Sequence, residues 1–454
     1  MAVPVALAAA LAACTGPSSG TATPPASPSP DVPALEVDVR KIDGFAPFGR
    51  VRQRWLREPA RGVGETIASI YEAAYLDVAA WRDGHSSEHL AAFTRDAARV
   101  ARSDVRNLAL GPEGGRLTSV QARPVRASVR FLLDRNRRPM AAVTSVRFIA
   151  TGRSEEGAVP IRQRADLTLH RIGGRWRVAS YEAEGRVGGR KVPPSTFAPP
   201  LASKDPLIVL VIGSDARPGQ SVSRTRADSL HLVGVNPRRN TGSVVGIPRD
   251  SFVPIPGAGT EKINASLFFG GPQRTVQTVE RLTGARIDAY VLTGFAGFQE
   301  LIRLVDGVEV RIPYRIDDRY SGAHFRPGDT RLSGGEALAF SRNRHDAPGG
   351  DFGRSMNQGR LLIAALAEFQ RDVRRSPVEL LRWVWAGARI LQTDLTLDEM
   401  FRLALAALTI EPGRVDNRIV GGSGGTVGGA SVIRLGPSAR RVFRNLARDG
   451  VLGG

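Results

Sequence analysis

Short apolar runs alternate with amphipathic stretches over the C-terminal half of the chain, and this alternation is the strongest constraint on the fold. Runs rich in Val, Ile and Leu occur at 207–212, 229–235, 242–247, 289–292 and 308–312. Helical spacing of apolar residues occurs at 272–283, 295–305, 334–341, 355–374, 377–391 and 396–407. Strands that are apolar along their whole length, with helices between them, predict an α/β domain whose helices cover both faces of a sheet.

Residues 35–196 carry a different pattern, with helical periodicity first and strand periodicity afterwards. Apolar residues recur at helical spacing over 65–81, and a further helix is expected from Ser87. Four strands are predicted at 125–133, 141–150, 165–170 and 176–182. Gly173-Gly174 lies between the last two and predicts a hairpin turn. We therefore expect a smaller α+β domain over 35–196, with the proline-rich stretch from Val192 as the linker that follows it.

The N-terminal residues have the pattern of a signal peptide and a tether. The apolar run of about eleven residues before Cys14 is too short for a membrane-spanning helix, which needs roughly 20 residues, but it suits a signal peptide over residues 1–14. Residues 15–34 are rich in Pro and Ser and predict a disordered tether. Residues 436–454 are expected to form a C-terminal helical tail.

Cys14 follows Leu11-Ala12-Ala13, an ending that resembles a bacterial lipobox. The resemblance implies that Cys14 is lipid-modified and anchors an extracytoplasmic protein to the outer face of the cell membrane. Ordinary signal-peptide cleavage, which would remove Cys14 and release the protein, is the alternative. Since Cys14 is the only cysteine, an intramolecular disulfide framework and a multi-cysteine zinc site are excluded.

The chain of 454 residues has a net charge of +19, and this charge is spread along the sequence. A distributed excess of this kind fits an anionic surface or polymer better than a concentrated DNA-reading stripe, so no nucleic-acid partner is expected. Only four of the 63 basic residues are lysines. Lys262, one of these four, therefore invites a specific explanation.

Charged residues gather at the ends of the predicted elements of the α/β domain. Four clusters share this position: Asp215 with Arg217; Arg226 with Asp228; Arg249 with Asp250 and Lys262; and Arg342, Arg344, Asp351, Arg354 and Gln358. In an open α/β sheet, ligands favour the carboxyl ends of the strands. The planar guanidinium of arginine matches phosphate oxygens two at a time, so the clusters point to a phosphorylated ligand. The alternative for any single pair is an internal salt bridge.

Taken together, these clusters resemble the LytR-CpsA-Psr (LCP) family of cell-wall glycopolymer ligases. Four features carry the match: Asp-x-Arg after a strand, Arg-x-Asp-Ser entering the next, Ile-Pro-Arg-Asp followed by Lys-Ile-Asn, and Arg-x-Arg with a following Asp, Arg and Gln. The resemblance covers 205–435 and implies an LCP-type α-β-α sandwich, a mixed central sheet covered by helices. Asp306-Gly307 departs from the usual Gly-Gly pair of the family. The order of elements over 35–196 resembles the cone-shaped nuclear-transport-factor-2-like superfamily.

The family resemblance implies a phosphotransferase that moves a glycopolymer from a polyprenyl pyrophosphate carrier to a peptidoglycan hydroxyl. It implies that Asp215 and Asp228 hold Mg²⁺ or another divalent cation. It also implies that the pyrophosphate is gripped by Arg217, Arg226, Arg249, Lys262, Arg342, Arg344 and Gln358. Asp351 is the candidate base, oriented by Arg354. The alternatives are a polyprenyl pyrophosphatase with the same residues, and a non-catalytic binder of anionic wall polymer.

Overall fold

The computed structural model describes most of the chain, as six segments: 32–82, 88–103, 108–199, 206–217, 219–236 and 238–452. The predicted signal peptide with Cys14, and all but the last three residues of the predicted tether, lie outside these segments. Backbone contacts divide the chain into two compact units, which we call the first unit (within 17–199) and the second unit (200–375 and 382–454). None of the helices in the described segments combines the length and apolar character that crossing a membrane requires.

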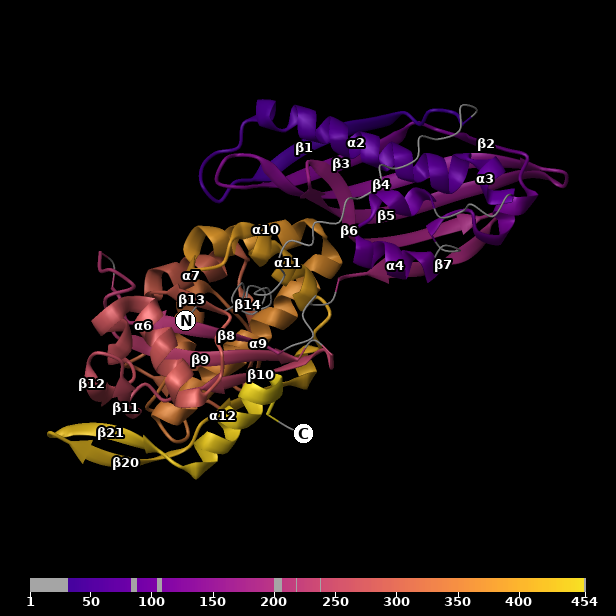
Figure 1. Ribbon diagram of the computed structural model, residues 1–454. Coiled ribbons are helices and arrows are strands. Elements are labelled where there is room, and N and C mark those ends of the chain that lie inside the picture. The colour runs from indigo at the N-terminus through magenta and orange to yellow at the C-terminus, as the bar shows by residue number, and fades with distance from the viewer. Residues whose placement is uncertain are drawn as a thin grey trace. The chain divides into compact units, whose positions relative to one another are not determined.

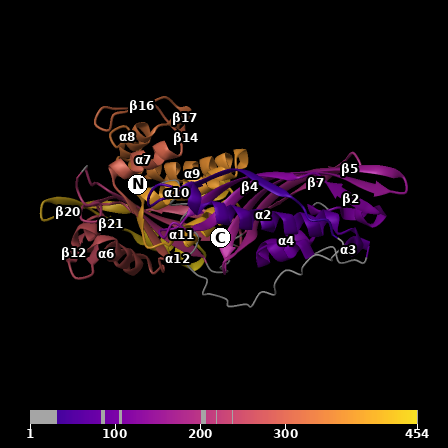
Figure 2. The same ribbon diagram turned by 90° about the horizontal axis from the view of Figure 1, so that it is seen from above.

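A seven-stranded sheet forms the first unit (Figure 1). Its strands follow the order β1 (Val37–Phe45), β3 (Val125–Leu133), β4 (Pro139–Ser154), β5 (Gly157–Ile172), β6 (Arg175–Val187) and β7 (Arg190–Phe197), with β2 (Ser119–Ala122) paired to β4. The helices are α2 (Arg57–Tyr71), α3 (Val78–Arg82) and α4 (Arg95–Ser103). Helices α2 and α4 lie on one side of the sheet (Figure 2), where they bury an apolar core that includes Val63, Ile67 and Phe148.

Two features of the first unit differ from the sequence prediction. The unit begins with β1, a strand that pairs in parallel with β3, so helices do not precede all strands. The expected linker from Val192 is instead part of β7, which pairs with β6 alone. Pro193 and Pro194 lack a backbone N–H, and an edge strand tolerates this because one side of it has no ladder. The predicted hairpin at Gly173-Gly174 is present, with both residues at positive φ between β5 and β6.

A six-stranded mixed sheet forms the centre of the second unit. The strand order is β18 (Gln392–Thr393), β13 (Ala289–Thr293), β8 (Leu207–Ser214), β9 (Ala227–Asn236), β10 (Thr241–Gly246) and β19 (Val415–Ile419). Strands β13, β8, β10 and β19 run in one direction, and β9 runs in the opposite direction between β8 and β10. Four two-stranded ribbons lie outside this sheet in the described residues: β11 (Phe252–Ile255) with β12 (Gly259–Lys262), β14 (Val308–Ile312) with β17 (Gly328–Leu332), β15 (Ile316–Asp318) with β16 (Ala323–Phe325), and β20 (Gly422–Val427) with β21 (Ala430–Leu435).

Helices cover both faces of the central sheet, as predicted. Helices α6 (Ala265–Thr283) and α12 (Pro437–Asp449) share one apolar cluster with Ile208, Leu210 and Leu232 of the sheet. Helix α9 (Asp351–Arg375) packs on β9, β10 and β19. The other helices are α7 (Phe295–Leu304), α8 (Gly334–Arg342), α10 (Val378–Ile390) and α11 (Leu397–Ala407). The apolar run at 308–312 forms β14 (Val308–Ile312), which pairs with β17 (Gly328–Leu332) outside the central sheet.

Helix α9 approaches the sheet closely because glycine lies at the contact. A Cβ atom on Gly359 would lie 2.0 Å from Oδ1 of Asn417 on β19. The side chain of Asn417 is held in place, since its Nδ2 donates a hydrogen bond of 3.0 Å to the carbonyl oxygen of Met356. The absence of a side chain at residue 359 therefore fixes the distance between α9 and the sheet.

We expect Gly359→Ala to destabilise the second unit by about 1–3 kcal/mol, because overpacking a tight contact costs energy of that order. Hydrogen exchange of the β10 and β19 amides would measure the loss. Gly413→Ala is the matched control, because an added Cβ there meets no atom within 4 Å. Equal protection in the two variants would contradict the proposed contact.

Candidate functional site

The polar groups of the second unit converge at one edge of the central sheet. Strands β8, β10, β13 and β19 end at this edge and β9 begins there, because β9 alone among these five strands runs in the opposite direction. Asp215 follows β8, Asp228 opens β9, and Arg249 follows β10. The first residue of α9, Asp351, reaches the same place, since it lies 3.7 Å from Nε of Arg249. Four segments far apart in the sequence thus supply one site.

Asp228 enters the site from a β-bulge. In the ladder between β8 and β9, Gly213 is opposite Ser229 and Ser214 is opposite Ala227, so Asp228 is the extra residue. A bulge re-aims the side chain that it carries. Beyond the bulge, the N–H of Arg226 donates to Oδ1 of Asp215 at 3.0 Å, which fixes the Asp215 carboxylate at the end of β8.

Arg249 is the centre of the charge network. Its guanidinium forms an ion pair with Asp228, and its Nε lies 3.8 Å from Asp250 and 3.7 Å from Asp351. Burial lowers the pKa of Arg249, but the carboxylates of Asp228, Asp351 and Asp250 outweigh burial and raise it. Arg249 is therefore charged at any physiological pH. Its Nε is buried and donates to no hydrogen-bond acceptor in the described structure.

Asp351 and Arg354 lie one turn apart on α9 and face each other. Nη2 of Arg354 lies 2.7 Å from Oδ1 of Asp351. Arg354 is only 7% exposed; burial lowers its pKa, Arg249 lowers it further and Asp351 opposes the shift. Both oxygens of Asp351 are buried; Oδ1 is ion-paired with Arg354 and Arg249, and Oδ2 has no partner within the part of the chain that the structure describes. A carboxylate oriented by a buried cation, with one oxygen left to accept a proton, has the arrangement of a general base.

Asp250 is a member of the network that the site prediction left out. Its carboxylate lies 3.0 Å from Nζ of Lys262, which ends the ribbon of β11 and β12. Asn264, two residues further on, is buried and binds both neighbours through its backbone: its N–H donates to the carbonyl of Arg249 and its carbonyl accepts from Ala227. Helix α6 begins at the next residue, so these bonds direct its N-terminus toward the site. The adjacency of Asp250 to Arg249 in sequence was the signal for it.

The other residues predicted to bind phosphate are not part of the ion-pair network around Arg249. The side chains of Arg217, Arg226, Arg342 and Arg344 are exposed. Arg342 stacks over the ring of Phe295, with 5.1 Å between its guanidinium carbon and the ring centre. Gln358 is buried, and its Nε2 donates a hydrogen bond of 3.1 Å to the carbonyl of Ser341. Gln358 thus ties α9 to the end of α8, and its amide nitrogen is already occupied within the protein.

Asp318 anchors the loop that carries Arg342 and Arg344. Its buried carboxylate accepts hydrogen bonds from the N–H of Arg344 and from Nδ2 of Asn343, and it lies 3.2 Å from Nδ1 of His345. Burial raises the pKa of Asp318, but hydrogen bonds from Arg344 and Tyr320 outweigh burial and lower it to about 2. No motif pointed to Asp318, because it lies on a separate ribbon 26 residues before Arg344.

His231 joins the sheet to the start of α9 beneath the site. It is fully buried, Nε2 lies 3.1 Å from the carbonyl oxygen of Ser355, and Nδ1 lies 3.0 Å from Oγ of Ser229. A carbonyl only accepts, so Nε2 carries the proton and Nδ1 accepts from Ser229. Burial lowers the pKa of His231 to about 4, and the nearby Arg354 contributes to the shift. His231 is therefore neutral at pH 7.

An exposed aromatic pair lies on α6, four and five residues after Asn264. Phe268 and Phe269, in the first turn of α6, are 59% and 48% exposed, and their ring centres are 5.7 Å apart. Gly270 and Gly271 follow with non-helical backbone angles and kink the helix. Helix α6 thus begins next to a residue bonded to Arg249 and carries exposed apolar side chains in its first turns.

Comparison with known proteins identifies one family and several relatives. The model of the LytR_cpsA_psr family matches residues 178–447, more than half of the chain. The polyisoprenyl-teichoic acid–peptidoglycan teichoic acid transferase TagU of Bacillus cereus is 34% identical over 205 residues, which cover 44% of this chain and 64% of the relative. TagU of Bacillus subtilis is 40% identical over 163 residues, which cover 36% and 52%. The chain thus spans less than two thirds of the length of these relatives.

Among solved structures, the crystal structure of B. subtilis TagV aligns with a TM-score of 0.47 and 27% identity. The alignment covers 55% of this chain and 98% of TagV.

The second unit should lose stability in mild acid through His231. In the unfolded chain His231 takes up a proton near the ordinary pKa of 6.5, whereas in the folded chain its pKa is about 4. The free energy of unfolding therefore has its full value above pH 6.5 and falls by about 2–3 kcal/mol as the pH drops from 6.5 to 4. Denaturant unfolding across this range should show a smaller loss for His231→Gln than for the native chain. An unchanged pH profile of unfolding in His231→Gln would contradict this account.

Proposed function

The chain belongs to the LytR-CpsA-Psr family, and from this premise we propose that it transfers a glycopolymer from a polyprenyl pyrophosphate carrier to a hydroxyl of peptidoglycan. The observation that carries the proposal is the network of Arg249, Asp351 and Arg354 at the sheet edge, two cations around one carboxylate with no hydrogen-bond partner in the described structure. The relatives named above are teichoic acid transferases. The anionic glycopolymer of this chain is of the same chemical class.

The proposed reaction is a displacement at phosphorus. The acceptor hydroxyl oxygen forms a bond to the sugar-linked phosphorus, and the bond from that phosphorus to the bridging oxygen breaks, which releases polyprenyl phosphate. Asp351 takes the proton of the hydroxyl, and Arg354 holds its carboxylate in place. Arg249 neutralises charge on the diphosphate, with Arg217, Arg226, Arg342, Arg344 and Lys262 around it. Gln358 acts by positioning α9 against Ser341.

We propose that Asp215 and Asp228 hold Mg²⁺ together with the diphosphate. The hydrogen bonds between described residues use only Oδ1 of each carboxylate, which leaves Oδ2 of each for a cation. The described residues contain no cluster of three or more metal-binding side chains. Two carboxylates fit Mg²⁺, because this ion often takes one or two carboxylates and completes its shell with phosphate oxygens and water. The bound cation supplies charge neutralisation for the diphosphate.

The cellular setting is also part of the proposal. The sequence around Cys14 supports a lipid anchor, which would place the protein on the outer face of the membrane beside its lipid-linked donor. For the first unit, we propose a relationship to the nuclear-transport-factor-2-like superfamily. Helices on one face of a long, mostly antiparallel sheet support this relationship.

Asp351→Asn and Arg249→Gln should each abolish most transfer from a synthetic polyprenyl-pyrophosphate sugar to peptidoglycan fragments in the presence of Mg²⁺. Loss of a general base costs about 10²–10⁴-fold in kcat, and loss of one charge-stabilising donor about 10²–10³-fold. The matched controls are Asp416→Asn and Arg281→Gln, two exposed residues of the same unit, and both should retain activity.

Product analysis separates the alternatives. Phosphate release that needs no acceptor would identify a pyrophosphatase, because water would replace the hydroxyl. Donor binding without turnover by the native chain would identify a binder of anionic wall polymer. Either result would overturn the transferase.

The aromatic pair yields a second test, of lipid recognition. The polyprenyl chain is joined to the diphosphate, so it must leave the charged site over adjoining surface, and Phe268 and Phe269 offer the exposed apolar surface there. The double substitution Phe268→Ser/Phe269→Ser should raise KM for a long-chain donor about tenfold or more, since each buried methylene contributes about 0.8 kcal/mol.

A donor with a short, water-soluble lipid is the control for the aromatic pair, and its KM should change less than twofold. Equal effects on the two donors would show that the phenylalanines act through the fold and would rule out lipid contact.

A further inference from the structure

The solvent-facing side of the sheet in the first unit carries a set of arginines that the proposed reaction does not use. Five exposed arginines from four adjacent strands form it, and we call them the arginine face: Arg126, Arg147, Arg162, Arg164 and Arg186. Cross-strand register places them on one face, because directly opposed residues of paired strands point to the same side. The opposite face is the one that carries α2, α4 and the apolar core (Figure 2).

The arginines lie opposite one another. Arg126 of β3 is opposite Arg147 of β4, and Arg147 is opposite Arg164 of β5. Arg162 of β5 is opposite Arg186 of β6. Like charges in directly opposed positions destabilise a sheet. A folded sheet that keeps three such pairs side by side is poised for a ligand that neutralises them.

The protein itself supplies little neutralisation. In the described structure, the side chains of Arg126, Arg147, Arg162 and Arg186 form no ion pair or hydrogen bond. Asp166 lies 3.7 Å from Arg164. Two exposed acids of β6, Glu184 opposite Arg164 and Glu182 opposite Asp166, form no ion pair with these arginines in the described structure. On β1, the residue aligned with Arg126 is Asp38, and it pairs with Arg40.

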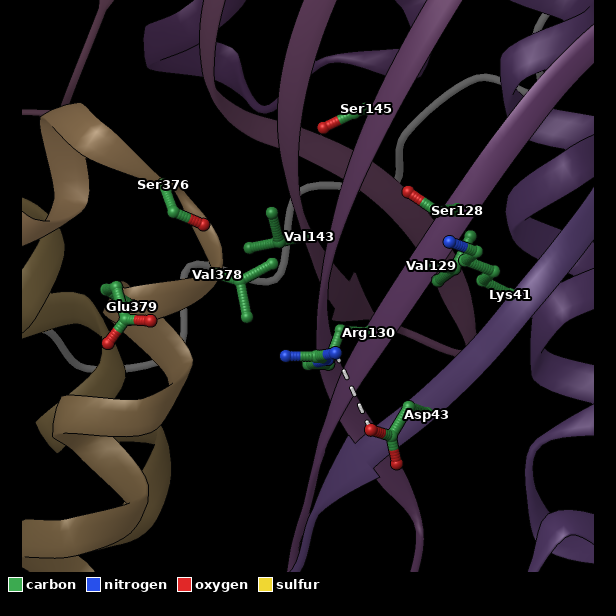
Figure 3. Close-up of a pocket in the computed structure, with 10 residues that line it drawn as sticks. All are labelled: Lys41, Asp43, Ser128, Val129, Arg130, Val143, Ser145, Ser376, Val378 and Glu379. Carbon is green, nitrogen blue, oxygen red and sulfur yellow. Dashed lines mark ion pairs between the residues drawn. The ribbon is translucent and has the colours of Figure 1, made fainter. Parts of the chain in front are cut away.

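Arg130, on the same sheet, differs from these arginines because its charge is neutralised by an ion pair. Arg130 of β3 is aligned with Asp43 of β1, and its Nη2 lies 3.6 Å from the Asp43 carboxylate (Figure 3). The same strand therefore carries one arginine with an acidic partner and one, Arg126, without. Four of the five arginines of the arginine face thus lack an acidic partner in the described structure, whereas Arg164 and the neighbouring Arg130 each have one.

The geometry of the arginine face fits an extended chain of anions. Adjacent strands lie about 4.8 Å apart, so the row from Arg126 to Arg164 offers cationic groups at regular steps across the sheet. Ile149 is the one large apolar side chain exposed among these arginines, and no aromatic side chain lies there for bases to stack on. One isoleucine also gives little surface for insertion into a bilayer. A flexible, phosphate-bearing polymer is the occupant that fits a flat, regularly charged and largely polar surface.

We propose that the arginine face binds the phosphate-bearing repeat units of the wall polymer. The identity of this polymer rests on the proposed function, since it is the glycopolymer that the second unit would transfer. The first unit would then bind the polymer through the arginine face and select polymers with anionic repeat units. This selection is separate from recognition of the diphosphate by the second unit.

The test compares two full-length variants that remove the same charge. The first is R126Q/R147Q/R162Q/R186Q, on the arginine face. The second is R50Q/R54Q/R57Q/R61Q, at exposed arginines before and on α2 whose side chains form no ion pair in the described structure. Binding of poly(glycerol phosphate) at low salt should weaken about tenfold or more in the first variant and less than twofold in the second. Circular dichroism and the melting temperature verify that both variants fold.

The outcomes separate the inference from the proposed function. Equal weakening in both variants, or none in either, overturns the inference. Loss of binding to phosphatidylglycerol vesicles without loss of polymer binding also overturns it, because the partner would then be a membrane. The first variant should transfer a single-sugar donor at the native rate and a poly(glycerol phosphate)-bearing donor with a raised KM. A native chain that transfers no donor, but whose polymer binding still depends on the arginine face, would refute the transferase and leave the inference standing.

Discussion

The ion-pair network around Arg249 is the interaction on which the candidate site depends. Three carboxylates surround this guanidinium, and each comes from a different segment: Asp228 from the bulge of β9, Asp250 from the turn after β10 and Asp351 from the start of α9. Partly buried charges are costly unless they are paired, so removing any partner leaves the others uncompensated. The network therefore fixes the ends of three elements, and it contains buried polar atoms of Arg249 and Asp351 that form no hydrogen bond within the described structure.

Rigid support below the network turns this pairing into a site of defined geometry. Gly359 lets α9 lie close to β19, and His231 ties the first turn of α9 to β9 through Ser355. Asp318 holds the loop that carries Arg344, because its carboxylate accepts a hydrogen bond from the N–H of Arg344. A catalytic carboxylate is effective only when neighbouring contacts hold its position within a fraction of an ångström. In this protein those contacts come from a glycine, a neutral histidine and a buried aspartate, none of which carries charge to the ligand in the proposed reaction.

The sequence predicted the local elements well and the contacts between them poorly. Periodicity found β8, β9, β10 and most helices of the second unit within a few residues, because strands that are apolar throughout differ clearly from amphipathic helices. The exception is α6, which begins at Ala265, seven residues before the predicted start at 272. The charged clusters were correctly expected at strand ends, but sequence could not show that Lys262 would pair with Asp250 or that Gln358 would turn inward to Ser341. Asp318 was missed because its role arises only from a long-range contact. In the first unit, the prolines of β7 led to the prediction of a linker where the structure has a strand. Proline is compatible with a strand at the edge of a sheet, but the sequence does not show that β7 is an edge strand.

The prolines of β7 also limit strand pairing between different copies of the protein. An unprotected sheet edge presents a row of N–H and C=O groups that can recruit the edge of another molecule. Pro193 and Pro194 lie in the middle of β7, the last strand of the sheet, and carry no N–H, so this part of the edge lacks a donor that such a foreign strand would need. A segment with the composition of a linker thus protects one edge of the first unit against edge-to-edge aggregation.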